Sequence, residues 1–292
     1  MNKIFHILVI IIIFLAIITS SLGLFYSTGG QSYDFVNLYG DTIRIYGEGI
    51  YKNDTVFLVP VFKGTDFTIL FFVMPLLIFA LFFDKKNNTL KTKLFLTSIV
   101  SFVLYYSISI SFGVKYNVLH LVYIALFSCS LFTFIIGFSL VNKYNITSSI
   151  KICTNGLKIL LIICGLSLFI AWLPDIITSL LNGRPLAMIG IYTTSVTNVI
   201  DLAIYPPSFF LCLFLLQKGN KLGYILLSIL LTNLLIIGIT LINQTVFHII
   251  AGEEMPVIAL ISMVGIFILL AIFGIKYQIK LFRNIQDSGN VI

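Results

Sequence analysis

The sequence predicts an all-α integral membrane protein in which about eight helices cross the bilayer. Its 292 residues are 59% hydrophobic and 10% charged, a balance that leaves too little polar surface for a soluble domain. The hydrophobic residues gather in runs of about 20, the length that a helix needs to cross roughly 30 Å of hydrocarbon. Both observations predict a single polytopic transmembrane helix bundle over residues 1–292.

The predicted spans follow these apolar runs. They cover residues 4–25, 67–83, 94–112, 118–141, 157–181, 196–216, 222–241 and 256–275, and the seventh helix continues outward to about residue 250. The first run follows Lys3 and so resembles a signal peptide, but it is longer than the usual apolar region and no Ala-x-Ala site follows. We expect an uncleaved first helix. Cleavage would leave seven helices and an outside N-terminus.

The distribution of charge predicts the orientation, because Lys and Arg collect on the side that is not translocated. With the N-terminus inside, the cytoplasmic segments hold 13 of the 18 basic residues but only Asp84 and Asp287 of the 11 acidic ones. Both termini are therefore predicted to be cytoplasmic. The net charge of +7 does not indicate nucleic-acid binding, since the basic residues are scattered through short connections.

One predicted connection is long: residues 26–66 form an extracytoplasmic loop rich in Gly, Tyr, Asp and Thr. Within it, residues 42–46 and 55–59 have a β-favouring composition on either side of a polar stretch. They predict either a small β-hairpin that caps the outer end of the bundle or an irregular tethered loop.

Polar and ionisable side chains collect in or near the outer half of the predicted bundle. An ionisable group at the bilayer centre costs roughly 2.5–3.5 kcal/mol, so each one suggests a function. Asp66 is predicted to open the second span. Asp175 lies beside Trp172 near the membrane surface, and Arg184 can pair with Asp175 or with an anionic group of a ligand. The candidate ligand-binding residues are Asp201, Asn198, Tyr205, Asp175, Arg184, His120, His248 and Asp66.

The sixth predicted helix carries the sharpest local pattern. Asn198, Asp201 and Tyr205 are spaced to share one helical face, and Pro206 and Pro207 follow directly. The two prolines are predicted to bend or interrupt the helix beside this polar face. The face is consistent with an interhelical hydrogen bond that fixes packing, with a water-filled or ligand-lined pocket, or with a proton relay.

Motifs for a bound metal, a cofactor or nucleophilic catalysis are not found. The three histidines do not form His-x-x-x-His or His-Glu-x-x-His, and there is no Gly-x-Ser-x-Gly elbow or Gly-rich phosphate loop after a strand. The sequence therefore predicts no metal and no cofactor, and it does not favour an enzyme.

Three segments carry a resemblance to a known group of proteins. They are Tyr-Gly-Glu-Gly-Ile-Tyr at residues 46–51, Trp-Leu-Pro-Asp-Ile at 172–176 and Asn-Val-Ile-Asp-Leu-Ala at 198–203. With them the chain resembles an uncharacterised family of bacterial multi-pass membrane proteins that has no known activity. The resemblance implies a bacterial cytoplasmic membrane and highlights the same outer-half positions, but it implies no reaction.

These observations favour one function and leave two alternatives open. The favoured one is binding or transport of a small molecule, ion or lipid through an outward-facing polar pocket. The alternatives are a non-catalytic partner or assembly protein whose outer loop docks another protein, and a membrane-embedded enzyme that acts on a lipid-linked substrate. In the enzyme, Asp175, Asp201 or His248 would serve as acid or base.

Overall fold

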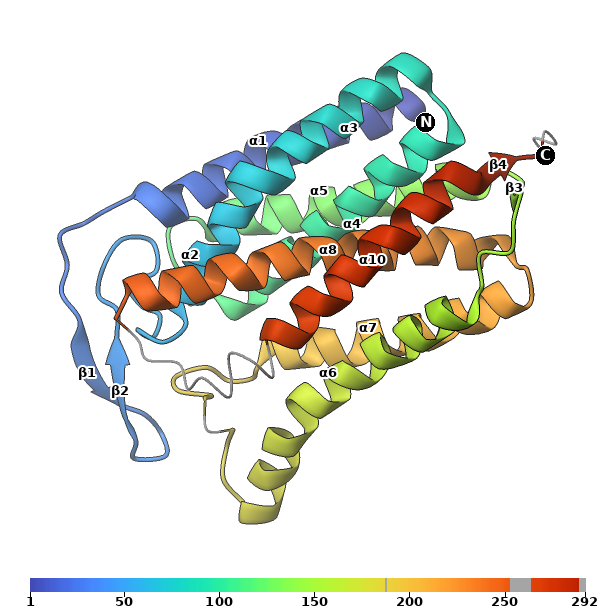
Figure 1. Ribbon diagram of the computed structural model, residues 1–292. Coiled ribbons are helices and arrows are strands. Elements are labelled where there is room, and N and C mark those ends of the chain that lie inside the picture. The colour runs from blue at the N-terminus through green and yellow to red at the C-terminus, as the bar shows by residue number, and fades with distance from the viewer. Residues whose placement is uncertain (187, 253–263, 289–292) are drawn as a thin grey trace.

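The chain folds into a bundle of long apolar helices with two small two-stranded sheets (Figure 1). The computed structural model describes residues 1–186, 188–252 and 264–288. Within these residues, seven helices are long and apolar enough to cross a membrane. They are α1 (Asn2–Phe25), the run of α2 (Val59–Thr68), η1 (Ile69–Val73) and α3 (Met74–Asn87), α4 (Leu90–Gly113), α5 (His120–Asn142), α6 (Asn155–Asn182), α7 (Val196–Gln217) and α8 (Lys221–Ile250).

The predicted eighth span, 256–275, lies partly outside the described residues. Its described part is α10 (Ile266–Asn284), which crosses α8 in Figure 1 and continues well past the predicted end. Lys276, Lys280 and Arg283 break the apolar run, so the span predicted from hydropathy ends before the helix does. Tyr277 and Leu281 between them are nevertheless buried, and their packing extends the helix.

The second predicted span also begins much earlier than the hydropathy pattern indicates. Helix α2 starts at Val59, with Pro60 in its first turn, where a proline costs no helical hydrogen bond. Asp66, which was predicted to open this span, therefore lies inside the helix and not at its start. The π-helical turn η1 then separates Asp66 from Pro75, which has no N–H to donate back into the helix.

Connections from alternate spans meet at each end of the bundle. At one end, Asn2 donates to Asn88, Lys221 donates to the carbonyl of Asn142, and β3 (Ile146–Ser148) pairs with β4 (Ile285–Asp287). We call this the basic end, since it gathers the 13 basic residues that the charge pattern assigns to one side. Figure 1 shows the N-terminus and strand β4 there.

The opposite end carries the β-hairpin, and we call it the hairpin end. Strand β1 (Tyr33–Val36) pairs antiparallel with β2 (Thr42–Ile45), whereas Thr55 makes a single bridge to Ile45. A hairpin is thus present, but residues 55–59 are not its second strand. The turn explains the choice: Asn37 Oδ1 accepts hydrogen bonds from the backbone of Tyr39 and Asp41, and Gly40 adopts φ +86°.

Helix α4 lies at the centre of the bundle. It buries 14 of its 24 residues, including Ser98, Ser101 and Ser107, and separates two apolar clusters. One cluster is built mainly from α1, α2, α3 and α5, and the other mainly from α6, α7, α8 and α10. Helix α6 is the opposite case, because its buried residues all lie between Leu157 and Gly165.

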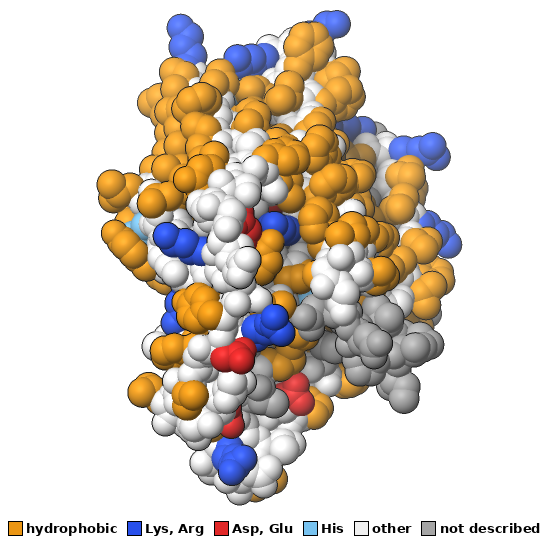
Figure 2. Space-filling model, turned by 90° about the vertical axis from the view of Figure 1, so that its left-hand side faces the viewer, with side chains coloured by type: hydrophobic (Ala, Val, Ile, Leu, Met, Phe, Trp, Pro, Cys, Tyr) orange, Lys and Arg blue, Asp and Glu red, His pale blue; other side chains and the backbone are white. Residues whose placement is uncertain are grey.

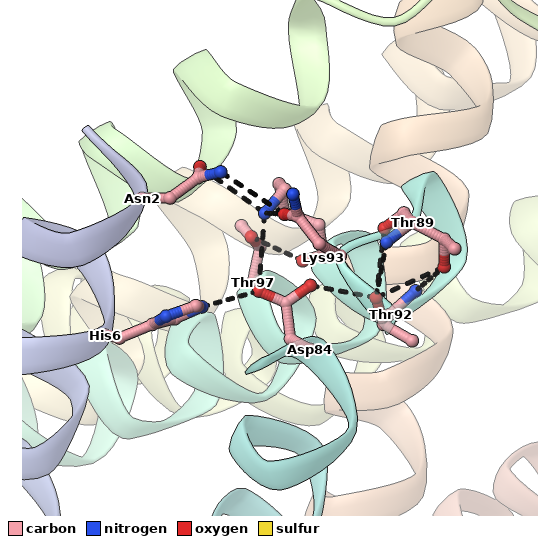
Figure 3. Close-up of polar contacts among 8 residues, drawn as sticks. Asn2, His6, Asp84, Thr89, Thr92, Lys93 and Thr97 are labelled. Carbon is pink, nitrogen blue, oxygen red and sulfur yellow. Dashed lines mark hydrogen bonds and ion pairs between the residues drawn. The ribbon is translucent and has the colours of Figure 1, made fainter. Parts of the chain in front are cut away.

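A polar cluster ties three helices together at the basic end (Figure 3). The Asp84 carboxylate is fully buried and receives His6 Nε2 at 2.8 Å, Thr92 Oγ1 at 2.8 Å and Lys93 Nζ at 3.3 Å. Lys93, itself 2% exposed, also donates to Asn88 at 2.8 Å. The cluster thereby fixes the start of α1 against the turn between α3 and α4.

Replacing Lys93 by methionine is expected to destabilise the bundle by about 3–5 kcal/mol, because it leaves the Asp84 carboxylate buried without its cation. Lys91→Met, two residues earlier at an exposed position, is the matched control and should change stability by less than about 0.5 kcal/mol. Unfolding of the purified protein in micelles measures both. Adding Asp84→Asn to Lys93→Met should restore part of the loss, and equal stability of the two lysine variants would contradict this account.

Candidate functional site

Asp66 forms the first of two buried carboxylate sites. Its side chain is 0% exposed, and its two oxygens accept hydrogen bonds from Tyr51 at 2.5 Å and from Tyr106 at 2.7 Å. Gly23 of α1 packs so closely that a methyl group there would collide with Asp66 Oδ2 and approach the Tyr51 hydroxyl. The site therefore joins α1, α2, α4 and the loop before α2, and each carboxylate oxygen has a donor.

Asp201 forms the second carboxylate site, on α7. It is 8% exposed, and its oxygens accept from Tyr105 Oη at 3.1 Å and from Trp172 Nε1 at 3.1 Å. The predicted face is present, since Asn198 and Tyr205 are buried with it. The Tyr205 ring lies 5.6 Å from that of Tyr105, measured between centroids.

Helix α7 runs through Pro206 and Pro207 without interruption, so of the two predicted effects, a bend or a break, the break does not occur. The prolines remove the donors that would bond the carbonyls of Leu202 and Ala203, but their fixed φ is compatible with a helix. Buried neighbours on both sides, among them Tyr205 and Phe209, hold the segment in the bundle. This packing keeps the segment helical through both prolines.

A row of small polar groups continues from Tyr205 along the contact between α4 and α8. Asn233 donates to the Tyr205 hydroxyl at 3.4 Å and accepts from Ser101 at 3.0 Å, and Ser98 and Ser228 share a hydrogen bond of 2.9 Å. Such contacts between Ser and Asn are typical of helix packing inside membranes. The Tyr205 end of this row is thus fixed by packing.

The structure does not bring all of the predicted site residues together. Asp66 and Asp201 are reached by adjacent tyrosines of α4 and lie in different halves of the bundle. Asp175 and Arg184 are both exposed, and the ion pairs found in the described part of the chain do not join them. His120 is half-buried beside Tyr116, and buried His248 lies beside Phe57, with ring centroids 5.1 and 5.3 Å apart.

The side chains that could bind a metal ion are also scattered through the described part of the chain. Over residues 1–186, 188–252 and 264–288, no three His, Cys, Asp or Glu side chains come close enough to hold a metal ion together. The buried carboxylates instead receive phenol, indole and ammonium donors, which suit hydrogen bonding and charge pairing.

A junction that the sequence analysis missed lies at the hairpin end. Asp54 is 0% exposed, and its Oδ1 accepts from the backbone N–H of Lys115 at 2.9 Å and from the Tyr192 hydroxyl at 2.8 Å. Its Oδ2 is buried without a hydrogen-bond partner among the described residues. The three residues come from three separate connections, so no spacing in the sequence indicates that they meet.

A groove opens beside this junction, with a volume of about 500 Å³. Figure 2 faces this end of the molecule, where the acidic side chains in view lie in its central and lower parts, below a mainly apolar upper part. The groove is lined by Tyr33, Phe35, Asn37, Leu38, Tyr39, Ile45, Asn53, Lys115, Gly190, Ile191, Tyr192 and Thr193. None of these is among the residues that the sequence analysis selected.

Comparisons of the chain with known protein families, with curated proteins and with solved structures find no significant match. The resemblance noted from three sequence segments therefore stays an expectation, and the site must be interpreted from its own chemistry.

Asp54 should make the hairpin end sensitive to pH. Burial raises the pKa of this carboxyl from about 3.8 to about 7, although the bonds from Lys115 and Tyr192 oppose the rise. Because the folded pKa lies above the unfolded one, the stabilisation is full below about pH 4 and is lost as the pH rises through 7. Hydrogen exchange of the Lys115 amide, corrected for its intrinsic rate, should show protection falling across this range.

The matched variant is Asp54→Asn, which keeps an acceptor for Lys115 and Tyr192 but cannot ionise. Its corrected protection should be flat between pH 4 and 8. A flat profile in the unsubstituted protein, or the same slope in both proteins, would refute the assignment to Asp54.

Proposed function

We propose that this protein is a multi-pass membrane protein that binds, for storage or transport, a small amphiphilic lipid-like molecule at Asp201. The observation that carries the proposal is the position of Asp201: a carboxylate within an apolar span, at the point where α6 separates from the rest of the bundle. An ionisable side chain in such a span is costly to insert, so its presence suggests a use.

The loose packing of α6 supports this position as an entrance from the lipid. None of the residues that α6 buries lies beyond Gly165, and Ile170 and Leu180 are 73% and 75% exposed. In Figure 1 the outer half of α6 diverges from α7. Trp172 spans this divergence through its hydrogen bond to Asp201.

The chemistry around Asp201 supports a particular kind of ligand. A carboxylate accepts hydrogen bonds, so the head of the ligand should carry an ammonium or another strong donor that replaces Trp172 Nε1. The apolar surface of α6 beside it suits a hydrocarbon tail. An amine-bearing lysolipid satisfies both requirements.

Trp172 is the single tryptophan of the chain and donates to Asp201, so its fluorescence reports on the site directly. Titration of the purified protein with lysophosphatidylethanolamine, below its critical micelle concentration, should shift the emission in a saturable way. Asp201→Asn should weaken this binding at least tenfold, since it removes the charge and keeps the shape. Lysophosphatidylglycerol, which lacks the amine, should bind less tightly than the amine lipid.

The control variant is Asp66→Asn, which alters the other carboxylate site by the same chemistry in the other half of the bundle. It should leave the fluorescence titration unchanged. The proposal fails if no saturable signal is seen, or if Asp201→Asn and the unsubstituted protein bind the lipid equally well.

We further propose eight spans with both termini in the cytoplasm of a bacterium, which places the hairpin end outside. The support is the collection of 13 basic residues at the other end of the bundle. A cysteine at Leu38, 99% exposed in the hairpin turn, should react with an impermeant maleimide in intact cells. A cysteine at the exposed Lys86 should react only after lysis. The reverse pattern would overturn the orientation.

A further inference from the structure

We propose that the groove at the hairpin end is a second binding site, and that it takes a small organic anion that carries a ring. The site is distinct from Asp201, which does not line the groove. Its volume of about 500 Å³ lies within the usual range for small-molecule sites.

The aromatic side chains of the groove determine one half of the ligand chemistry. Tyr33, Phe35 and Tyr39 of the hairpin line the groove and are 52%, 49% and 60% exposed, and Tyr192 joins them from the connection between α6 and α7. Exposed rings of this size lose unfavourable contact with water when a flat apolar face covers them. A ring, whether aromatic or saccharide, presents such a face.

The charge of the groove determines the other half. Lys115 is the charged residue among the lining residues, and no Asp or Glu belongs to that set. Its ammonium donates to the carbonyl of Ile191 and lies 5.3 Å from the centre of the Tyr192 ring. An ammonium has three donors, so two remain for a ligand, and a carboxylate would form a charge-assisted bond with them.

The groove is already held in shape. Asn37 of the hairpin donates to the carbonyl of Gly190 at 3.0 Å, which ties its two walls together. Asp54 holds the Lys115 backbone and the Tyr192 hydroxyl from behind. A ligand would therefore not have to order these segments on binding, and less of its interaction energy would be lost to ordering.

Binding of four probes to the purified protein in lipid nanodiscs tests the proposal by calorimetry. Glucuronate and benzoate combine a ring with a carboxylate, while glucose and benzyl alcohol are their neutral counterparts. At least one acid should bind, and at least tenfold more tightly than its neutral partner. Binding of glucuronate alone would identify a sugar acid, binding of benzoate alone an aromatic acid, and binding of both the shared chemistry.

Variants of the groove complete the test. Lys115→Met should weaken binding of the acid at least tenfold, whereas Lys115→Arg should keep most of it, which separates loss of charge from a misfolded groove. Lys52→Met changes an exposed lysine of the same outer loop that does not line the groove and should bind normally. Tyr39→Ala should also weaken binding, through loss of ring contact.

Three results would overturn the proposal: neither acid binding at 10 mM, neutral and acidic partners binding equally, or Lys115→Met binding as well as Lys115→Arg. Asp201→Asn should leave acid binding unchanged. The groove and the Asp201 site can therefore fail independently of each other.

Discussion

The arrangement of the bundle depends on two adjacent tyrosines of α4. Tyr105 donates to Asp201 and Tyr106 donates to Asp66, so one helix satisfies a buried carboxylate in each half of the bundle. Successive residues of an α-helix point about 100° apart, which is why neighbours in sequence can serve different sites. Inside a membrane no water is available to replace these bonds, so the position of α4 fixes the positions of α2 and α7.

Other helix contacts likewise pair polar side chains with partners inside the bundle. Helices α2 and α8 approach until Gly64 lies against the backbone of Gln244, and the side chain of Gln244 then donates to Thr65 at 2.8 Å. Asn243 repeats the contact on Thr68 at 2.9 Å. The small residue allows the two helices to approach closely, and the polar side chains then bond across the contact, so Gln244 and Asn243 have a packing role.

Features that depend on local sequence were predictable, and features that depend on distant partners were not. The long apolar runs predicted the seven helices that are long and apolar enough to cross a membrane, and helical spacing predicted the shared face of Asn198, Asp201 and Tyr205. The early start of α2 was missed because Lys63 and Asp66 interrupt its hydropathy, yet Tyr46 and two further tyrosines satisfy them in the fold. The same holds for the hairpin, whose register depends on side-chain bonds within its turn.

The polar clusters around Asp84 and Asp54, at the two ends of the bundle, could not be predicted from the sequence, because burial and distant partners define them. Asp84 and Lys93 are close in sequence and were read only as charges of a cytoplasmic turn, although both are buried in the fold. Asp54 meets Lys115 and Tyr192 across three connections, which hydropathy and motif spacing do not relate to one another.

The two carboxylate sites differ in how tightly their hydrogen-bond donors are packed. This difference is why we propose ligand binding at Asp201 and not at Asp66. Asp66 is enclosed by two buried tyrosines and by Gly23, so a ligand could enter only by moving the core. Asp201 receives one of its bonds from Trp172, on the half of α6 that buries no residues, so that bond can be exchanged without unpacking the bundle. Lys115 could also bind a ligand without unpacking the bundle, because its ammonium keeps further N–H donors beside the one that bonds the carbonyl of Ile191. Both binding sites that we propose therefore have donors that a ligand could exchange or use, whereas the contacts of Asp66 lie wholly within the packed core.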